Sequence, residues 1–332
     1  MNNYKISVII PVFNAEKYVL ETIKSVANQA FDSYEIVIVN DGSTDDSINI
    51  IDNYLGSQNI PYQIINQHNS GLSKARNMGV YASLGEYVCF VDSDDIIDEN
   101  HLISMYELAS KNELMLVHCG YESTNEACRR GRKVFTYDGK IYNAKEVISY
   151  AVKRKHVVFV CGLLINKKFL IENQLYFNEK MFFGEDSDYI WKTLFSANRI
   201  GYTNSDTYKY LERDNSMMKT ISKKLANTYI EEFTKTIEDI RINNSGNIEM
   251  LELVYYRELL GFFHAFSKCS CKKNFNTLFK KIDRRRMCKE LLKLSDLKVL
   301  VAAIILFINP SLLYFFLSGG RHKKNNEEEI CN

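Results

Sequence analysis

Four aspartates crowd into the stretch "FVDSDDIID", residues 90–98, which directly follows an apolar run. Asp92 and Asp94 are two positions apart, so in extended backbone their side chains project in the same direction. Two converging carboxylates suit a hard divalent cation such as Mg²⁺ or Mn²⁺, which takes oxygen ligands and shares them with substrate phosphates. Asp95 and Asp98 lie just before an apolar-periodic segment, and we expect them to cap a helix there.

Two further acidic segments allow both a structural and a chemical interpretation. The segment "FFGEDSDYIWKTL" is expected to begin a helix with Glu185, Asp186 and Asp188, and acids in a first helical turn often interact only with the helix dipole. Asp41 lies in "NDGS", a strong turn signal, where an aspartate often bonds to nearby backbone. The residues alone leave both alternatives open.

Short β-rich runs alternate with helical segments in the first hundred residues. We expect buried strands over 5–10, 34–40, 62–66 and 86–91. We expect helices over about 15–29 and Leu72–Ser83, and between them a helix that begins at a cap on Ser43 or Thr44. Strands separated by helices imply right-handed crossovers and a mostly parallel, doubly wound α/β sheet.

The polar segments follow the ends of these expected strands. Pro11–Asn14, Asp41–Asp46, Asn66–Gly71 and Asp92–Asp95 each come directly after one of the four. Ligands of open α/β sheets bind beyond the carboxyl ends of the strands. The sequence therefore predicts one site at this edge, and "PVFNAE" in place of G-x-G-x-x-G argues against a nicotinamide dehydrogenase.

Composition narrows the class of protein. The chain has 332 residues, 46% of them hydrophobic, with 42 basic and 41 acidic side chains. A net charge of +1 gives no support to nucleic-acid binding. The eight cysteines form no C-x-x-C pair, which favours reduced thiols, and "MNNYKISVIIP" does not look like a signal peptide. We expect the catalytic part to stay in the cytoplasm.

Five segments together resemble the family 2 glycosyltransferases of GT-A fold. They are "SVIIPVFNAEKYVLETIKSVANQ", "EIVIVNDGSTDDS", "NSGLSKARNMGV", "GEYVCFVDSDD" and "GEDSDYIW", in the family's order and spacing over roughly residues 5–216. The resemblance implies inverting, metal-dependent transfer of a sugar from a nucleotide-diphosphate sugar, expected to be a UDP-sugar, to a hydroxyl of a glycan or lipid-linked glycan. An inactive nucleotide-sugar-binding or scaffolding module of the same fold is the alternative.

The resemblance also implies roles for individual residues. Asp186 would be the general base, Asp94 the principal ligand of Mn²⁺ or Mg²⁺, and Asp92 a second contact to metal or ribose. The nucleotide sugar would contact Pro11, Val12, Phe13, Asn14, Asp41, Asn69, Lys74, Arg76, Asp92, Ser93, Asp94, Glu185, Arg213 and Ser216. Within this set, Arg76 would reach the nucleotide or the carboxylates around it, and Arg213 the diphosphate. A solvated helix face is the alternative for Lys74, and Asp188 receives no role.

The carboxyl-terminal third differs in composition. We expect a catalytic domain over 1–218, a helical basic region over 219–298, an apolar segment over 299–317 and a disordered polar tail over 318–332. The apolar segment "VLVAAIILFINPSLLYFFL" nearly reaches the ~20 residues of a spanning helix. Its central "NPS" also allows two short helices in one leaflet, or a buried hairpin. We expect attachment to the cytoplasmic face of the membrane.

Overall fold

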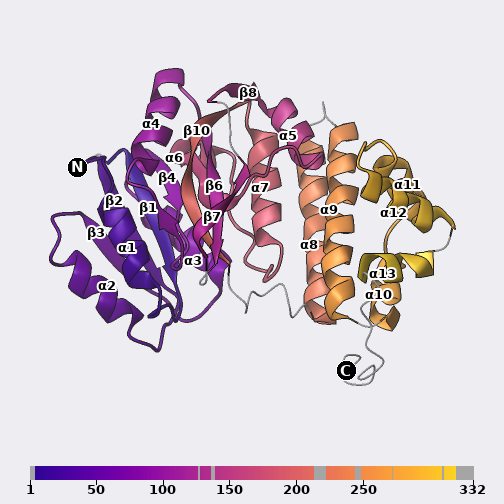
Figure 1. The fold of residues 1–332 in the computed structure, drawn as a ribbon, viewed down its shortest axis with the longest axis horizontal. Coiled ribbons are helices and arrows are strands. Elements are labelled where there is room, and N and C mark those ends of the chain that lie inside the picture. Colours follow the sequence, from indigo (N-terminus) through magenta and orange to yellow (C-terminus); the bar gives the residue numbers. More distant parts are fainter. Residues whose placement is uncertain are drawn as a thin grey trace. The chain divides into compact units, whose positions relative to one another are not determined.

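The computed structural model describes residues 4–125, 128–135, 139–212, 222–243, 248–270, 272–308 and 310–318. The chain divides into two compact units, each shown in Figure 1. The first unit comprises Met1–Val147 and Val157–Asp214, and the second comprises Ile148–His156 and Asn215–Asn332. A short excursion of the chain, residues 148–156, therefore joins the helical unit before the first unit is complete.

The first unit is built on one mixed sheet, which has ten strands in the described ranges. They are β1 (Ile6–Val12), β2 (Tyr34–Asn40), β3 (Tyr62–Asn66), β4 (Tyr87–Phe90), β5 (Ile96–Ile97), β6 (Leu116–Asn125), β7 (Cys128–Phe135), β8 (Ile141–Asn143), β9 (Leu163–Asn166) and β10 (Arg199–Glu212). The order is β3-β2-β1-β4-β9-β6-β10-β5, with β7 beside β6 and β8 beside β10.

The mostly parallel α/β sheet that the sequence predicts is confirmed, most clearly in its amino-terminal half. β3, β2, β1 and β4 run parallel, whereas β9 is antiparallel to both of its neighbours. β1 is buried along its whole length, as expected of a parallel strand covered on both faces. Val12 pairs with Asn40, and Asn40 with Asn66, so three strand ends meet at one edge.

Seven α-helices accompany these strands along the described part of the chain. They are α1 (Val19–Ala27), α2 (Ser47–Leu55), α3 (Leu72–Ala82), α4 (His101–Asn112), α5 (Ala144–Val152), α6 (Lys167–Glu172) and α7 (Glu185–Ser196), with a 3₁₀ turn η1 at Val160–Gly162. Helix α3 packs on β1 and β2. A Cβ added to Gly79 would lie 2.2 Å from Ile9 Cγ2, so only glycine permits so close an approach. This contact holds α3 tightly on the sheet.

Two capping predictions are wrong. Helix α2 does not start at a cap on Ser43 or Thr44 but follows Asp46, because the Ser43 hydroxyl instead accepts the Asn14 N–H at 3.1 Å. Helix α4 follows Asn100, and neither Asp95 nor Asp98 caps it. The Asp98 carboxylate pairs with Lys209, and the Asp95 carboxylate bonds to β10, as described below.

The second unit is helical. Its described helices are α8 (Lys223–Asn243), α9 (Ile248–Cys269), α10 (Lys272–Phe279), α11 (Arg284–Leu291), α12 (Leu297–Ile308) and α13 (Pro310–Ser318). α8 packs against α9, and α9 also contacts α10, α11 and α13. Aromatic side chains fill the interior: the rings of Tyr229 and Phe262 stack 4.5 Å apart, and Phe263 meets Phe275 edge-on at 5.2 Å.

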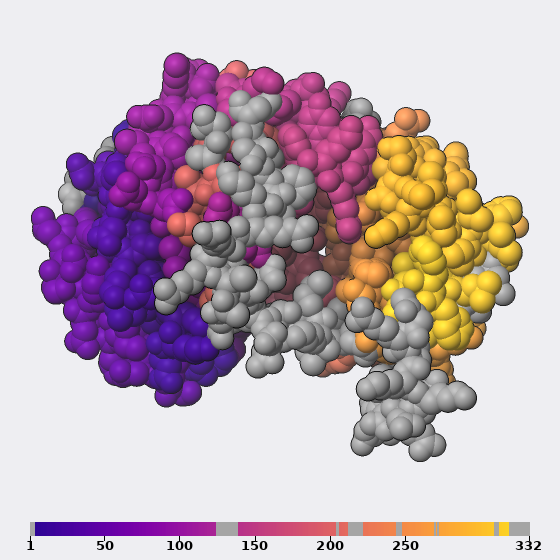
Figure 2. All heavy atoms as spheres, viewed as in Figure 1, coloured from indigo at the N-terminus to yellow at the C-terminus, as the bar shows by residue number. Residues whose placement is uncertain are grey.

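The apolar segment 299–317 is divided between α12 and α13, the two-helix form that the sequence allowed. In the part of the chain that the structure describes, every helix is too short or too polar to cross a lipid bilayer. One side of α12 is buried at Val299 and Leu306, while Phe307 and Ile308 are exposed. Figure 2 shows these helices, in yellow, at the surface of their unit. Of the expected polar tail 318–332, residues 319–332 lie outside the described residues.

Candidate active site

A buried arginine joins two acidic segments at the edge of the sheet. Arg76 Nη1 donates to Asp186 Oδ1 at 2.5 Å, and its Nη2 donates to Asp92 Oδ1 at 2.9 Å. The guanidinium also lies over the ring of Phe177, 5.1 Å from its centroid, which is a cation–π distance. Its side chain is only 1% exposed. Arg76 therefore connects the segment after β4 with the first turn of α7.

The charge of Arg76 is held in place by these carboxylates. Burial alone would lower the pKa of the guanidinium, but Asp186 and Asp92 outweigh burial and raise that pKa well above its usual value. Contact with the surrounding carboxylates is one of the two roles that the sequence allowed for Arg76, and these two hydrogen bonds show it. The position of Arg76 follows from α3, which Gly79 holds against β1 one turn later in the helix.

Asp95 has a different setting from Asp92 and Asp94. It is 1% exposed, accepts a hydrogen bond from Tyr208 Oη at 2.7 Å and accepts another from Leu211 N–H at 2.9 Å. Burial, followed by the charges of Asp92 and Asp94, raises the pKa of Asp95 well above its usual range. The Tyr208 hydroxyl also accepts the Asp92 N–H at 3.3 Å. Asp95 thus links the end of β10 to the acidic segment, residues 92–98.

Sequence reasoning missed this role of Asp95 and its partner Tyr208. The two residues are separated by 113 positions, and only the pairing of β10 with β5 and β6 brings them together. Arg213 and Ser216, which follow β10 along the chain, lie outside the described residues.

Asp41 serves as the turn residue that its sequence context suggested. Its Oδ1 accepts from Gln67 Nε2 and from the Ser70 N–H, both at 2.7 Å, and its Oδ2 accepts from the Gly71 N–H at 2.9 Å. It is buried and holds the loop between β3 and α3. A carboxylate offers about four acceptor positions, so Asp41 retains capacity for one further donor.

The segment after β1 presents one exposed ring. Pro11 and Val12 are buried within β1, whereas the side chain of Phe13 is 48% exposed. Asn14 has a left-handed backbone, with φ of 47°, and its Oδ1 accepts the Thr44 N–H at 2.8 Å. Asn14 thereby ties the end of β1 to the loop after β2.

The remaining predicted contacts lie on neighbouring segments. Lys74, on α3, and Ser93, between Asp92 and Asp94, are half-buried, and Asn69 is exposed in the loop before α3. An exposed ring that the sequence analysis did not single out, Phe182, lies close to Gly71 in this loop.

The first turn of α7 carries acids in three distinct environments. Asp186 faces Arg76, while Asp188 is fully buried and pairs with Lys192 at 2.6 Å, which gives it a structural role. Glu185 is buried as well. Burial, and then the charge of Asp186, raises the pKa of Glu185 to about 7.

The sequence predicts that Asp92 and Asp94 hold a cation. Within the described ranges, no group of three acidic, histidine or cysteine side chains converges as a complete metal-ligand set. Mg²⁺ is commonly held by one or two carboxylates together with substrate phosphates. Asp92 has an oxygen for such a shared site, because its Oδ1 bonds to Arg76 and its second oxygen remains for a ligand.

Comparisons with known proteins identify the family of the chain. The family model described as glycosyl transferase family 2 matches residues 7–172, half of the chain. The glycosyltransferase GlyG of Streptococcus pneumoniae is 28% identical over 70% of this chain and 80% of its own length. EpsJ of Bacillus subtilis, an uncharacterised glycosyltransferase, is 29% identical over 64% of this chain and 62% of its own length.

The fold has solved counterparts. The crystal structure of residues 1–349 of TarS from S. aureus superposes with a TM-score of 0.71, at 19% identity, over 95% of this chain and 90% of that one. TarS in complex with UDP-GlcNAc gives a TM-score of 0.69, also at 19% identity. At this identity the likeness establishes the fold alone.

Proposed function

We propose, since this chain belongs to glycosyl transferase family 2, that it transfers a sugar with inversion from a UDP-sugar to a hydroxyl of a glycan or lipid-linked glycan. The observation that supports the proposal best is the bridge from Asp92 through Arg76 to Asp186. It joins the acidic segment expected at the donor diphosphate to the acid expected at the acceptor hydroxyl.

Asp186 is the residue that would take the proton of the acceptor. Arg76 bonds to Oδ1 of its carboxylate and so fixes the orientation of the second oxygen, Oδ2. That oxygen would accept the hydroxyl proton as the acceptor oxygen attacks the anomeric carbon. A single base on the face opposite the leaving group gives inversion in one displacement.

Asp92 and Asp94 would face the diphosphate. A Mn²⁺ or Mg²⁺ ion held by Asp94 and Asp92 would offset the negative charge of the departing diphosphate. Arg76 restrains Asp92 through one oxygen, and the Tyr208 hydroxyl bonds to the Asp92 N–H. The acidic segment therefore needs little rearrangement to receive the donor. Arg213 would add a planar donor to the phosphate oxygens.

A UDP-sugar is the proposed donor for two reasons. TarS, which shares the fold, has been solved with UDP and with UDP-GlcNAc. In this chain, the spare acceptor capacity of Asp41 suits the imino N–H of uracil, and the exposed ring of Phe13 offers a face on which a base can stack.

The direct test is release of UDP from a panel of UDP-sugars in the presence of Mn²⁺. We expect one donor to be hydrolysed slowly without an acceptor, and Asp94→Ala to abolish this turnover. Asp98→Asn is the matched control, because Asp98 lies in the same acidic stretch but pairs with Lys209 on β10. Binding of a UDP-sugar without turnover under all conditions would favour the inactive-module alternative.

The setting we propose is surface-polysaccharide assembly at the cytoplasmic face of the membrane. The second unit supports it with exposed apolar side chains on α12 and α13: Leu297, Ile304, Phe307, Ile308, Leu312, Phe315 and Phe316. Such a face suits a helix pair that lies in the lipid interface. Cofloatation of the protein with lipid vesicles tests this setting, and recovery of the protein only below the vesicle layer would contradict it.

A further inference from the structure

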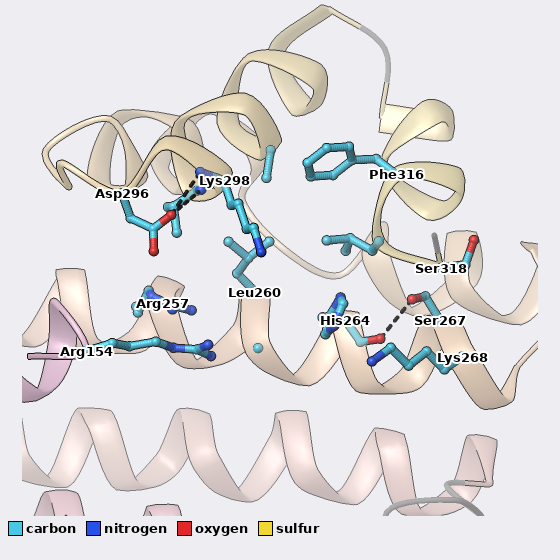
Figure 3. Close-up of a pocket in the computed structure, with 14 residues that line it drawn as sticks. Arg154, Arg257, Leu260, His264, Ser267, Lys268, Asp296, Lys298, Phe316 and Ser318 are labelled. Atoms are coloured by element: carbon cyan, nitrogen blue, oxygen red, sulfur yellow. Dashed lines mark hydrogen bonds between the residues drawn. The ribbon is translucent and has the colours of Figure 1, made fainter. Parts of the chain in front are cut away.

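A large cavity opens within the second unit, and none of its lining residues is assigned to the sugar-transfer site. Its volume is about 850 Å³, and its lining comes from α9, from both ends of the α12–α13 segment and from the excursion at residues 148–156. Figure 3 shows Arg257, Leu260, His264 and Lys268 along one face of α9, with Lys298 and Phe316 across the cavity.

Arg257 is the most informative residue of this lining. It is 7% exposed, yet in the part of the chain described no carboxylate lies within ion-pairing distance of its guanidinium. Burial, and then the charge of Arg154, lowers the pKa of Arg257, and the opposing charges of Glu258 and Asp296 do not reverse this shift. Arginine is almost never buried without a partner, because an isolated charge loses its hydration. An external anion would supply the missing partner.

The residues around Arg257 add further positive charge. Arg154, Lys268 and Lys298 line the same cavity, and none of them forms a salt bridge within the described ranges. Burial, and then Lys268 and Arg154, lowers the pKa of His264, which reports the positive field there. Asp296 is the acid among the lining residues, and its Oδ1 is engaged with the backbone N–H groups at the start of α12. The cavity is strongly cationic.

The rest of the lining is apolar and open. Leu260, Val299 and Phe316 form part of the wall, and Phe316 also belongs to the exposed apolar side of α13. Gly261 lies inside α9, where glycine costs about 1 kcal/mol relative to alanine. A Cβ added to Gly261 would meet no atom within 4 Å, so close packing does not explain this glycine. Its effect is to keep the floor of the cavity free.

We propose that this cavity binds the phosphate group of an amphiphile, a phosphate ester that carries an alkyl chain. Guanidinium groups pair with phosphate oxygens through two parallel hydrogen bonds, which suits Arg257 and Arg154. The alkyl chain would lie along Leu260, Val299 and Phe316. The proposal does not rest on the transferase reaction, since binding is measured without donor or acceptor.

Titration calorimetry with the full chain tests it. The probes are octyl phosphate below its micelle concentration, inorganic phosphate and octyl glucoside. We expect octyl phosphate to bind at least tenfold more tightly than either of the others. Equal binding of inorganic phosphate would overturn the proposal in favour of a free-anion site, and equal binding of octyl glucoside would overturn it in favour of an uncharged apolar groove.

Two pairs of variants locate the binding. Gly261→Leu fills the floor of the cavity and should weaken octyl phosphate at least tenfold, whereas Gly261→Ala leaves most of the space and should bind it. Arg154→Gln with Lys268→Gln should also weaken binding at least tenfold. Lys273→Gln with Lys280→Gln removes the same charge from exposed positions of α10 and its end, and should change nothing. Unchanged affinity in Gly261→Leu would remove the cavity as the site.

Discussion

Arg76 in the first unit and Arg257 in the second are both buried, but their surroundings are opposite. Two carboxylates bond to Arg76, and they raise the pKa of its guanidinium despite burial. Arg257 lacks such a partner among the described residues, and burial together with Arg154 lowers its pKa. The first arginine is neutralised by the protein itself, whereas the second is left able to pair with a charge from outside.

This difference separates two uses of a buried cation. An arginine whose partners are in the chain orders them: Arg76 fixes Asp92 and Asp186, which are distant in sequence. An arginine without partners destabilises the fold slightly and gains a partner only when an anion binds. The same side chain is therefore a positioning residue in one unit and a ligand-binding residue in the other.

The largest effect we predict concerns Asp186, one of the two carboxylates that Arg76 positions. Asp186→Asn keeps an acceptor for Arg76 but cannot take a proton, so transfer should fall by about 10² to 10⁴-fold. The affinity for the UDP-sugar, measured by calorimetry in the presence of Mn²⁺, should change little. Turnover close to that of the wild type would remove Asp186 as the base.

A second prediction concerns Arg76 after the removal of its two carboxylate partners, which would leave it buried without a partner, as Arg257 is among the described residues. The double variant Asp92→Ala with Asp186→Ala leaves a buried guanidinium without its two partners and should lower the free energy of unfolding by about 3–5 kcal/mol. Adding Arg76→Met removes the stranded charge and should recover part of that loss. Urea unfolding of the three variants measures both steps. If the triple variant were less stable than the double, the charge of Arg76 would not be the cause.

The sequence alone predicts which segments meet at the acid-rich edge of the sheet, but it does not predict the side-chain contacts made there. Four strands followed by polar segments predict which residues meet, because the carboxyl ends of parallel strands share an edge. The bridge from Arg76 to Asp186 spans 110 positions and depends on how closely α3 packs on β1, which no local pattern records.

Other failures have the same physical origin. Asp95 and Asp98 were predicted to cap a helix, because a capping prediction from sequence uses residue type and position alone. The tertiary structure gives both of them partners on β10 instead, Tyr208 and Lys209. The cationic cavity was also not predicted, because Arg154 joins α9 only through the fold.

A smaller predicted effect is a pH dependence of stability that comes from the acid-rich edge of the sheet and not from the cationic cavity. Glu185 has a pKa raised to about 7 in the folded chain, against 4.5 ordinarily, through burial and Asp186. Between these two pH values the folded protein holds a proton that the unfolded chain has lost, so this residue makes stability fall as pH rises.

Glu185→Gln should remove that contribution. The difference in free energy of unfolding between the wild type and Glu185→Gln, measured in urea at intervals from pH 4 to 8, should turn against the wild type across this window and level off above it. Glu172→Gln, which replaces an exposed acid paired with Lys168, is the control for the loss of a glutamate elsewhere in the same unit. A flat difference for Glu185→Gln would show that its carboxyl titrates normally.

The smallest effect we predict is also the one that divides the two arginines most sharply. Arg257→Met should leave stability unchanged or raise it by up to ~1 kcal/mol, because it removes an unpaired buried charge and keeps the apolar stem. Arg241→Met in the same unit should lower stability by about 1 kcal/mol, since Arg241 bonds to Glu238 and Glu252. Octyl phosphate should then raise the melting temperature of the wild type but not that of Arg257→Met. A loss of stability in Arg257→Met as large as in Arg241→Met would mean that the chain already supplies Arg257 with its partner, and the contrast with Arg76 would disappear.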